Sequence, residues 1–317
     1  TYLLLYKSFY YLILQAYNNL LVSYMSSQGV NKPFIYINSI SILVVLFFSK
    51  MFIIDRNYKE MGFVYTKIIQ ESINLLCYLI VLFKSCNIKS IILPKFLDIL
   101  ENSKTFIITL LITILSFYGE FIGLEVNTYF AALLHDINDL AIWCTLINFT
   151  GIVFFISVGF SNFFRASIGQ IIGLKEFKKA KIKTKIYLFY VFVFSYLILV
   201  LILIFKYQIG YIYTGDKVLS VKMADILKIY GLNVFPTLAF YSVCSIYRLL
   251  DQENMLFNIT TIIYPLIIVG FSFVFCFVFN LRVYGITLGF SIGKLIIFIY
   301  MIYQLFYKIS WNTKKTD

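Results

Sequence analysis

Long uninterrupted apolar stretches are the feature that most constrains how this chain can fold. A helix that spans a bilayer needs about 20 mostly apolar residues. Five stretches of at least 18 residues carry no charge: 8–31, 140–164, 186–205, 229–247 and 254–281. Four others are apolar with one or two charges: 34–54, 62–83, 105–134 and 283–306. The sequence therefore predicts about nine membrane-spanning segments.

The composition excludes the soluble classes of protein. Of the 317 residues, 61% are hydrophobic and only 13% are charged, whereas about 25% of a soluble domain is charged. This excludes water-soluble, disordered and nucleic-acid-binding proteins, despite a net charge of +12. The runs are continuous, and the strands of a membrane barrel would alternate with a period of two. We therefore expect an all-α, polytopic membrane protein.

No pattern of residues predicts an enzyme. The sequence has one His and five Cys, and it has neither a phosphate-cradling loop nor a His-Glu-x-x-His helix. The Cys residues form no C-x-x-C pair, so they indicate no disulfide or zinc framework. We expect no catalytic residues, no metal site and no cofactor.

The basic residues predict the orientation in the membrane. With nine spans, one set of alternate connections holds twice as many Lys and Arg as the other set, and its densest part is the run Lys175–Lys185. The positive-inside rule places that set and the C-terminus in the cytoplasm, where the run would contact anionic lipid head groups. Thr1 would then start outside, which favours a chain that continues from a longer one.

A partial internal repeat relates the two ends of the sequence. Tyr24, Gln28 and Gly62 around the first three spans recur as Tyr247, Gln252 and Gly285 around the last three. The repeat predicts a parent of two six-helix halves, an arrangement typical of secondary transporters. Three helices would then precede Thr1.

Two acids lie inside the apolar stretch 105–134, and such groups usually mark a transport pathway. Glu120 and Glu125 are five residues apart, which is about 7.5 Å along a helix and about 140° around it. A straight helix cannot point both at one spot. Desolvation disfavours the charged form of a carboxyl, so each can bind a proton or pair with a cation. We predict that both bind substrate or protons; the alternative is a carboxyl bonded to neighbouring helices without transport.

Two further features bear on these acids. Gly119 and Gly123 flank Glu120 and would let a neighbouring helix or a substrate come close. Glu71, in the stretch 62–83, is a third acid in an apolar span and has no obvious partner in the sequence.

Short motifs along most of the chain occur in a family-like order. Residues 120–125 read EFIGLE, residues 166–173 read ASIGQIIG, 213–216 read YTGD, 283–285 read VYG, and 28–33 read QGVNKP. In this order the chain resembles the eukaryotic branch of the multidrug and toxic compound extrusion (MATE) family, in which the first motif is E-W-W-x-[FY]-E. Both acids are kept and both Trp are replaced.

The resemblance implies a two-lobe fold of twelve helices, of which this chain matches helices four to twelve. Residues 1–104 would be the second half of the N-terminal lobe with a cytoplasmic linker, and 105–317 the C-terminal lobe of six helices with a cytoplasmic tail. The chain departs from the family pattern at Ser167, where the family has Arg, and at Pro236 or Thr237, where many members of this branch have an acid.

The resemblance also implies a function. Members are secondary antiporters that export organic cations and xenobiotics by alternating access, with H⁺ or Na⁺ as the coupling ion. The partners expected here are a small organic cation or amphipathic solute and membrane lipid, with no nucleic acid. We expect a monomer in the plasma membrane or in a vacuolar or vesicle membrane.

Two other functions remain open. A flippase of the same superfamily would carry a lipid-linked sugar and would line its cavity with basic residues to hold phosphate. No Lys or Arg lies between 106 and 164, so this function ranks lower. The other alternative is a degenerate fragment that transports nothing.

Overall fold

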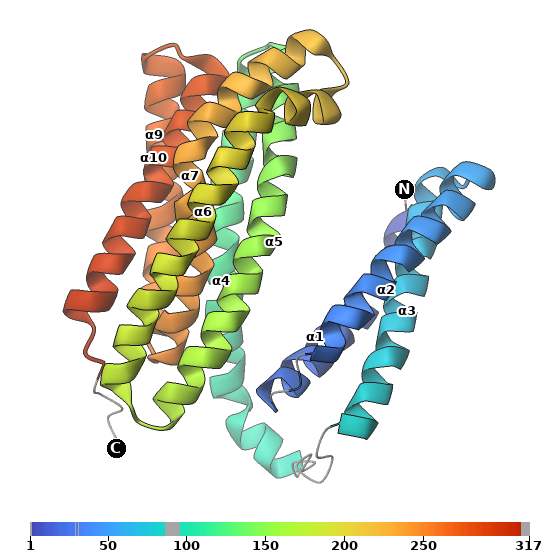
Figure 1. Ribbon diagram of the computed structural model, residues 1–317, viewed down its shortest axis with the longest axis vertical. Coiled ribbons are helices and arrows are strands. Elements are labelled where there is room, and N and C mark those ends of the chain that lie inside the picture. Colours follow the sequence, from blue (N-terminus) through green and yellow to red (C-terminus); the bar gives the residue numbers. More distant parts are fainter. Residues whose placement is uncertain (1, 29, 31, 86–95, 312–317) are drawn as a thin grey trace. The chain divides into compact units, whose positions relative to one another are not determined.

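The computed structural model describes residues 2–28, 30, 32–85 and 96–311. These residues fold into long helices joined by short turns (Figure 1). The α-helices are α1 (Tyr2–Ser27), α2 (Lys32–Ser49), α3 (Lys59–Ser85), α4 (Phe96–Leu133), α5 (Ile137–Gly173), α6 (Phe177–Thr214), α7 (Lys217–Leu249), α8 (Glu253–Phe257), α9 (Tyr264–Phe273) and α10 (Arg282–Tyr303). Four π-helical segments continue them: η1 (Lys50–Asp55), η3 (Asn258–Ile263), η4 (Val274–Val278) and η5 (Gln304–Lys308).

Eight of the nine spans predicted from the sequence correspond to candidate spanning helices in the described residues. Among the described residues, eight helices are long and apolar enough to cross a membrane, where α2–η1, α8 to η4 and α10–η5 each count as one. The ninth long helix, α1, is not among the eight, and it carries Gln15, Asn18 and Asn19 within its length. The all-α, polytopic fold predicted from the sequence is thereby confirmed.

The chain divides into two compact units, Thr1–Ile99 and Leu100–Asp317. In unit 1, α1 and α2 both pack on α3. In unit 2, α7 packs against α5, α6 and α10. Its span is the most buried of the eight, with 83% of the residues in its apolar window buried. An apolar helix enclosed by other helices can carry polar side chains at its contacts, because those side chains do not meet lipid.

The same turn geometry occurs once in each unit. A π-helical segment, η1 or η4, is followed by two residues of positive φ and then by a glycine that starts the next helix closely packed. The equivalent residues are Asn57 and Asn280, Lys59 and Arg282, and Gly62 and Gly285, and the members of each pair are 223 positions apart. This shared geometry supports the internal repeat inferred from the sequence.

Close backbone contact fixes α10 against α9. A Cβ atom at Gly289 would overlap the backbone of Ser272, so only glycine permits this approach. Five residues further along α10 lies Lys294, whose side chain is 1% exposed. The approach of the two helices carries Lys294 into the interior of unit 2.

Candidate functional site

The buried polar centre of unit 2 is built around Glu120 of α4. Its Oε1 atom lies 2.8 Å from Nζ of Lys294 on α10 and accepts a hydrogen bond of 3.2 Å from the Tyr264 hydroxyl on α9. Its Oε2 atom accepts a hydrogen bond from the hydroxyl of Tyr241 on α7. Four elements therefore converge on one carboxylate. The Glu120 side chain is 14% exposed, so the surrounding helices do not enclose it completely.

Gly119 brings α4 against η3 beside this centre. A Cβ atom at Gly119 would overlap the carbonyl oxygen of Thr260 and lie 2.8 Å from Cα of Thr261. The Thr261 hydroxyl also donates a 3.1 Å hydrogen bond to the carbonyl oxygen of Leu115. The close helix approach expected at Gly119 is therefore present, and it directs the next residue, Glu120, inward.

Aromatic rings surround the Lys294 ammonium. The ring centroids of Phe240, Phe290 and Tyr264 lie 5.5, 5.6 and 6.0 Å from Nζ. A cation within about 6 Å of a ring centroid is attracted by the electron-rich face of the ring. The site thus combines one carboxylate with three rings around an alkylammonium group.

The ion pair is the feature that the sequence analysis missed. Lys294 lies 174 positions after Glu120, and no local pattern connects the two residues. One signal was present, since Lys294 is the only charged residue in the apolar stretch 283–306, and a charge in a spanning helix usually has a partner. The absence of Lys and Arg between 106 and 164 therefore did not mean that the site lacks a basic residue, because Lys294 reaches it from α10.

Glu125 is not part of this centre. Its side chain is exposed on the surface of unit 2, and no ion pair to Glu125 occurs within the described part of the chain. The structure keeps the two acids apart, which agrees with the prediction from the angle of about 140° between them on the helix.

Glu71 has a partner in unit 1. Its side chain is buried, and its Oε2 atom accepts a 2.7 Å hydrogen bond from the amide nitrogen of Asn18 on α1. Glu71 and Lys294 are 223 positions apart, as are Asn18 and Tyr241. The turn equivalences have the same offset, so corresponding positions of the two units carry an acid in one and a base in the other.

A second charged cluster ties two turns of unit 2 together. Arg282 donates hydrogen bonds of 2.7 Å to Asp139 and to Asp136. Asp136 also caps α5 by accepting a hydrogen bond from the backbone of Asn138. His135 is exposed, with φ of 52°, in the turn before this cap. These contacts indicate a structural clamp, and no metal-binding group of His, Cys, Asp and Glu occurs among the described residues.

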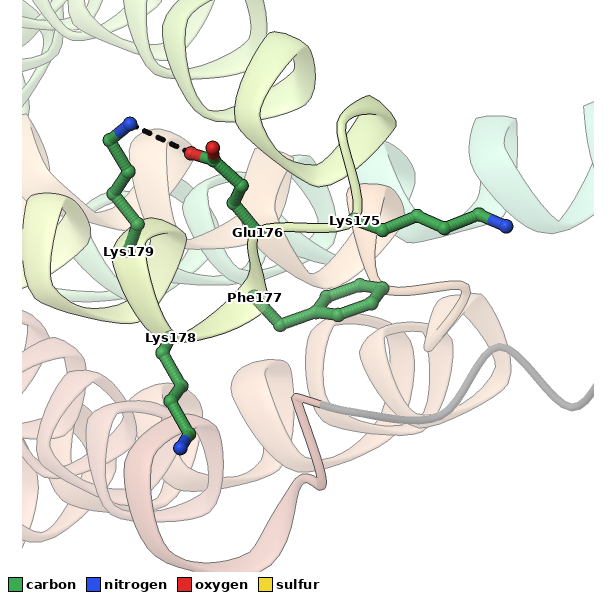
Figure 2. Close-up of a pocket in the computed structure, with 5 residues that line it drawn as sticks. All are labelled: Lys175, Glu176, Phe177, Lys178 and Lys179. Carbon is green, nitrogen blue, oxygen red and sulfur yellow. Dashed lines mark ion pairs between the residues drawn. The ribbon is translucent and has the colours of Figure 1, made fainter.

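A hollow at the α5–α6 turn is lined by the beginning of the basic run (Figure 2). Figure 2 shows Lys175 and Lys178 extending outward while Lys179 pairs with Glu176 at 2.8 Å. All four side chains are exposed. None of the residues that line this hollow contacts Glu120, so we assign it no part in the buried centre.

Comparisons with known proteins agree with this architecture. The MatE family model matches residues 113–281. No match to a curated protein was found. Three similar solved structures are the eukaryotic MATE transporter AtDTX14 (12% identity, TM-score 0.87), an outward-facing multidrug resistance MATE transporter (16%, 0.80) and a MOP superfamily transporter from Pyrococcus furiosus (16%, 0.79). They align with 96%, 93% and 91% of this chain, which covers 68%, 68% and 65% of theirs.

Proposed function

Because the chain belongs to the MatE family of membrane transporters, we propose that it is a secondary antiporter that exports small organic cations or amphipathic solutes. The coupling ion is H⁺ or Na⁺, and the chain acts as a monomer by alternating access. The family match and the apolar helices support a multi-pass membrane transporter. The choice of substrate rests on the Glu120 site.

The observation that carries the proposal is the environment of the Lys294 ammonium. A carboxylate oxygen at 2.8 Å and three aromatic rings within 6.0 Å hold this group. The same groups suit the head of an organic amine, since Lys294 is itself an alkylammonium on a tether. The site therefore has the chemistry to bind an organic cation once Lys294 leaves it.

Three cations then compete for Glu120 in the proposed cycle. Lys294 neutralises the carboxylate when the site is otherwise empty. An organic cation replaces Lys294 on the inner side of the membrane, and a coupling ion replaces the organic cation on the outer side. Each step exchanges one positive charge for another, so the carboxylate is never left buried without a partner, which would be strongly unfavourable.

We assign Glu125 a separate role as the acid that receives the cation after Glu120, since Glu125 lies nearer the end of α4 that the basic residues place on the outside. It is exposed and has no partner in the described residues, and it lies about 7.5 Å along α4 from Glu120. A cation could therefore pass from one carboxylate to the other without both acids contacting it at once.

A second candidate function is favoured by Lys294 itself. A buried ammonium could hold the phosphate of a lipid-linked sugar, as in the flippase alternative. The Pyrococcus furiosus relative is described by the reverse polarity of its binding pocket, which suggests a different function for that protein. Lys294 is paired with Glu120, however, so the site has no net positive charge to attract an anion.

The variant Lys294→Met separates the two functions because they predict opposite effects of the substitution on ligand binding. For a cation antiporter, removing the internal competitor lowers the KM for ethidium uptake into proteoliposomes by about tenfold, if the Lys294-bound state holds nine-tenths of the population. For a flippase, the same variant abolishes binding of a lipid pyrophosphate. Ethidium uptake driven by an imposed pH or Na⁺ gradient also identifies the coupling ion.

The variant Glu120→Gln is the companion test. Uptake of ethidium should fall to background while insertion into the membrane is unchanged. Wild-type uptake by this variant would exclude Glu120 as the binding group. Lys228→Met, which breaks an exposed ion pair with Asp225, is the matched control and should leave the KM for ethidium unchanged.

A further inference from the structure

Unpartnered polar groups gather in the interior of unit 2. Within the described part of the chain, several buried side-chain nitrogen and oxygen atoms have no hydrogen-bond partner. On α4, α7 and α10, six residues carry such atoms: Ser242, next to Tyr241, and five that lie to one side of the ion pair, which are Asn127, Tyr230, Asn233, Thr237 and Ser291. All five side chains are at most 1% exposed. Their clustering at these helices calls for a physical reason.

On α7 these residues form one stripe. Tyr230, Asn233 and Thr237 precede Tyr241 at intervals of three and four residues, and positions so spaced lie on one face of a helix. Tyr241 donates a hydrogen bond to Glu120, so the stripe begins at the carboxylate. It extends about 16 Å along α7 toward the start of that helix.

The other two helices add residues on the matching faces. Asn127 follows Glu120 by seven residues on α4, and Ser291 precedes Lys294 by three residues on α10. The end of α4 and the starts of α7 and α10 lie at the same end of unit 2 (Figure 1). All five residues are therefore displaced from the ion pair toward one end, the end of the Arg282 clamp. We name these five residues the polar column.

Energetics argue that the column is hydrated. A buried polar group without a partner destabilises the fold by about 1–3 kcal/mol. A buried water molecule typically makes about three hydrogen bonds to such groups. The Tyr230 hydroxyl illustrates the need, since Thr150 and Thr237 lie beside it but outside hydrogen-bond geometry. Ordered water within the column would satisfy these groups together.

We propose that the polar column is an internal water file that carries protons between Glu120 and the clamp end of unit 2. This inference deepens the proposed antiport and names H⁺ as the coupling ion. A proton from bulk water enters the file, each water passes on one proton as it receives another, and the Glu120 carboxylate becomes a carboxylic acid. Lys294 is then released from its ion pair, and the reverse transfer restores it.

The charged and titratable groups around Glu120 fit this direction of transfer. Lys294 of α10, Tyr241 of α7 and Tyr264 of α9 contact the carboxylate. Cys244 and Tyr230 of α7 lie near enough to interact with it electrostatically. The Glu120 carboxylate is the anion of this set, so in the proposed transfer it is the group that accepts the proton. At the far end of the column, the Phe149 ring lies 5.9 Å from the Tyr230 ring and 6.2 Å from that of Tyr213 at the end of α6. Phe149 therefore marks the end of the file that is farther from Glu120.

Radiolytic hydroxyl labelling of the full chain in nanodiscs tests the water without reference to transport. Tyr230 and Tyr247 are both fully buried on α7, but the Tyr247 hydroxyl is bonded to the carbonyl oxygen of Met301 at 2.9 Å. Hydroxyl radicals form from water adjacent to the ring that they label. We expect Tyr230 to be labelled about tenfold faster than Tyr247, because ordered waters sit beside it. Equal, slow labelling of both residues would overturn the water file.

Two modes of transport then test the proton route. In proteoliposomes, the double variant Asn127→Leu, Asn233→Leu should slow ethidium uptake driven by a pH gradient by about a hundredfold, the scale of a lost proton-transfer path. Ethidium–ethidium exchange, which moves no proton, should keep its wild-type rate. The control Ser195→Ala, on α6 and hydrogen-bonded within its own helix, should change neither rate.

The outcomes separate this inference from the proposed antiport. If both modes slow equally in the double variant, the column has only a structural role and the proton route is wrong. If the wild-type chain transports no ethidium in either mode, the proposed antiport fails, while the labelling of Tyr230 still decides whether the water file exists.

Discussion

At the scale of single residues, the ion pair between Glu120 and Lys294 controls both stability and selectivity. Each group is enclosed by helices, and each has the other as its charged partner. Replacing one member of a buried pair leaves the other charge uncompensated, whereas replacing both with apolar or neutral groups is often tolerated. A site that needs a resident cation for stability also discriminates against substrates that cannot replace that cation.

A double-mutant cycle measures this coupling. We expect Glu120→Gln and Lys294→Met each to lower the free energy of unfolding by about 3 kcal/mol, since each leaves an unpaired buried charge. The double variant should lose less than the sum of the two, and a coupling of about 1 kcal/mol or more is expected for residues in contact. Thermal unfolding in detergent gives the values. Strict additivity would mean that the two side chains do not interact.

At the scale of helices, contacts between backbones decide which side chains face the interior. α4 approaches η3 at Gly119, and α10 approaches α9 and η4 at its glycines. These two approaches direct Glu120 and Lys294, which each follow a glycine, toward one another. The repeated turns show the same kind of contact, since Gly62 packs against the backbone of η1 and Gly285 packs against the backbone of η4.

The substitution Gly119→Ala tests the importance of the close approach. The new methyl group would overlap the carbonyl oxygen of Thr260, and overpacking of this kind destabilises by about 1–3 kcal/mol. We expect a lower unfolding temperature and weaker ethidium uptake, because the shift of α4 displaces Glu120.

The matched control for Gly119 is Gly151→Ala on α5. No atom lies within 4 Å of a Cβ built at Gly151, and Ala is favoured over Gly inside a helix by about 0.5–1 kcal/mol. The control should therefore be neutral or stabilising. Equal effects of the two substitutions would show that the contact between α4 and η3 is not tight.

At the scale of the whole molecule, the basic residues predict how the chain lies in the membrane. The α5–α6 turn, with its lysines, and the C-terminus are expected in the cytoplasm. The α4–α5 and α6–α7 turns are then expected on the outside. With this orientation the polar column extends from Glu120 toward the outer face, which is the side from which an inward proton gradient would supply Glu120.

Side-specific cysteine labelling checks the orientation. In a background without native cysteines, Lys217→Cys at the start of α7 should react with a membrane-impermeant maleimide added to intact cells. Lys178→Cys near the start of α6 should react only after the cells are permeabilised. Both positions are exposed, so a reversed pattern would mean that the protein has the opposite orientation.

The sequence by itself determined the class of fold and most helix positions. Apolar runs report the preference of each segment for lipid locally, so the spans follow from them directly. The helices of unit 2 extend beyond the predicted runs, as α6 does at Phe177–Thr214 against 186–205, because charged residues at helix ends reach water and were excluded from the runs. The motif order likewise led to the MATE family, which the family model confirms.

Only the tertiary structure decided what surrounds Glu120. The sequence identified the acid, and the structure supplied its partners Lys294, Tyr241 and Tyr264, which lie 121 to 174 positions away. It also placed Glu125 on the surface, where the sequence had treated the two acids alike. The physical reason is that hydropathy and helix periodicity are local quantities, whereas a buried ion pair depends on which helix faces meet, and close contacts at small residues far apart in the chain set those faces.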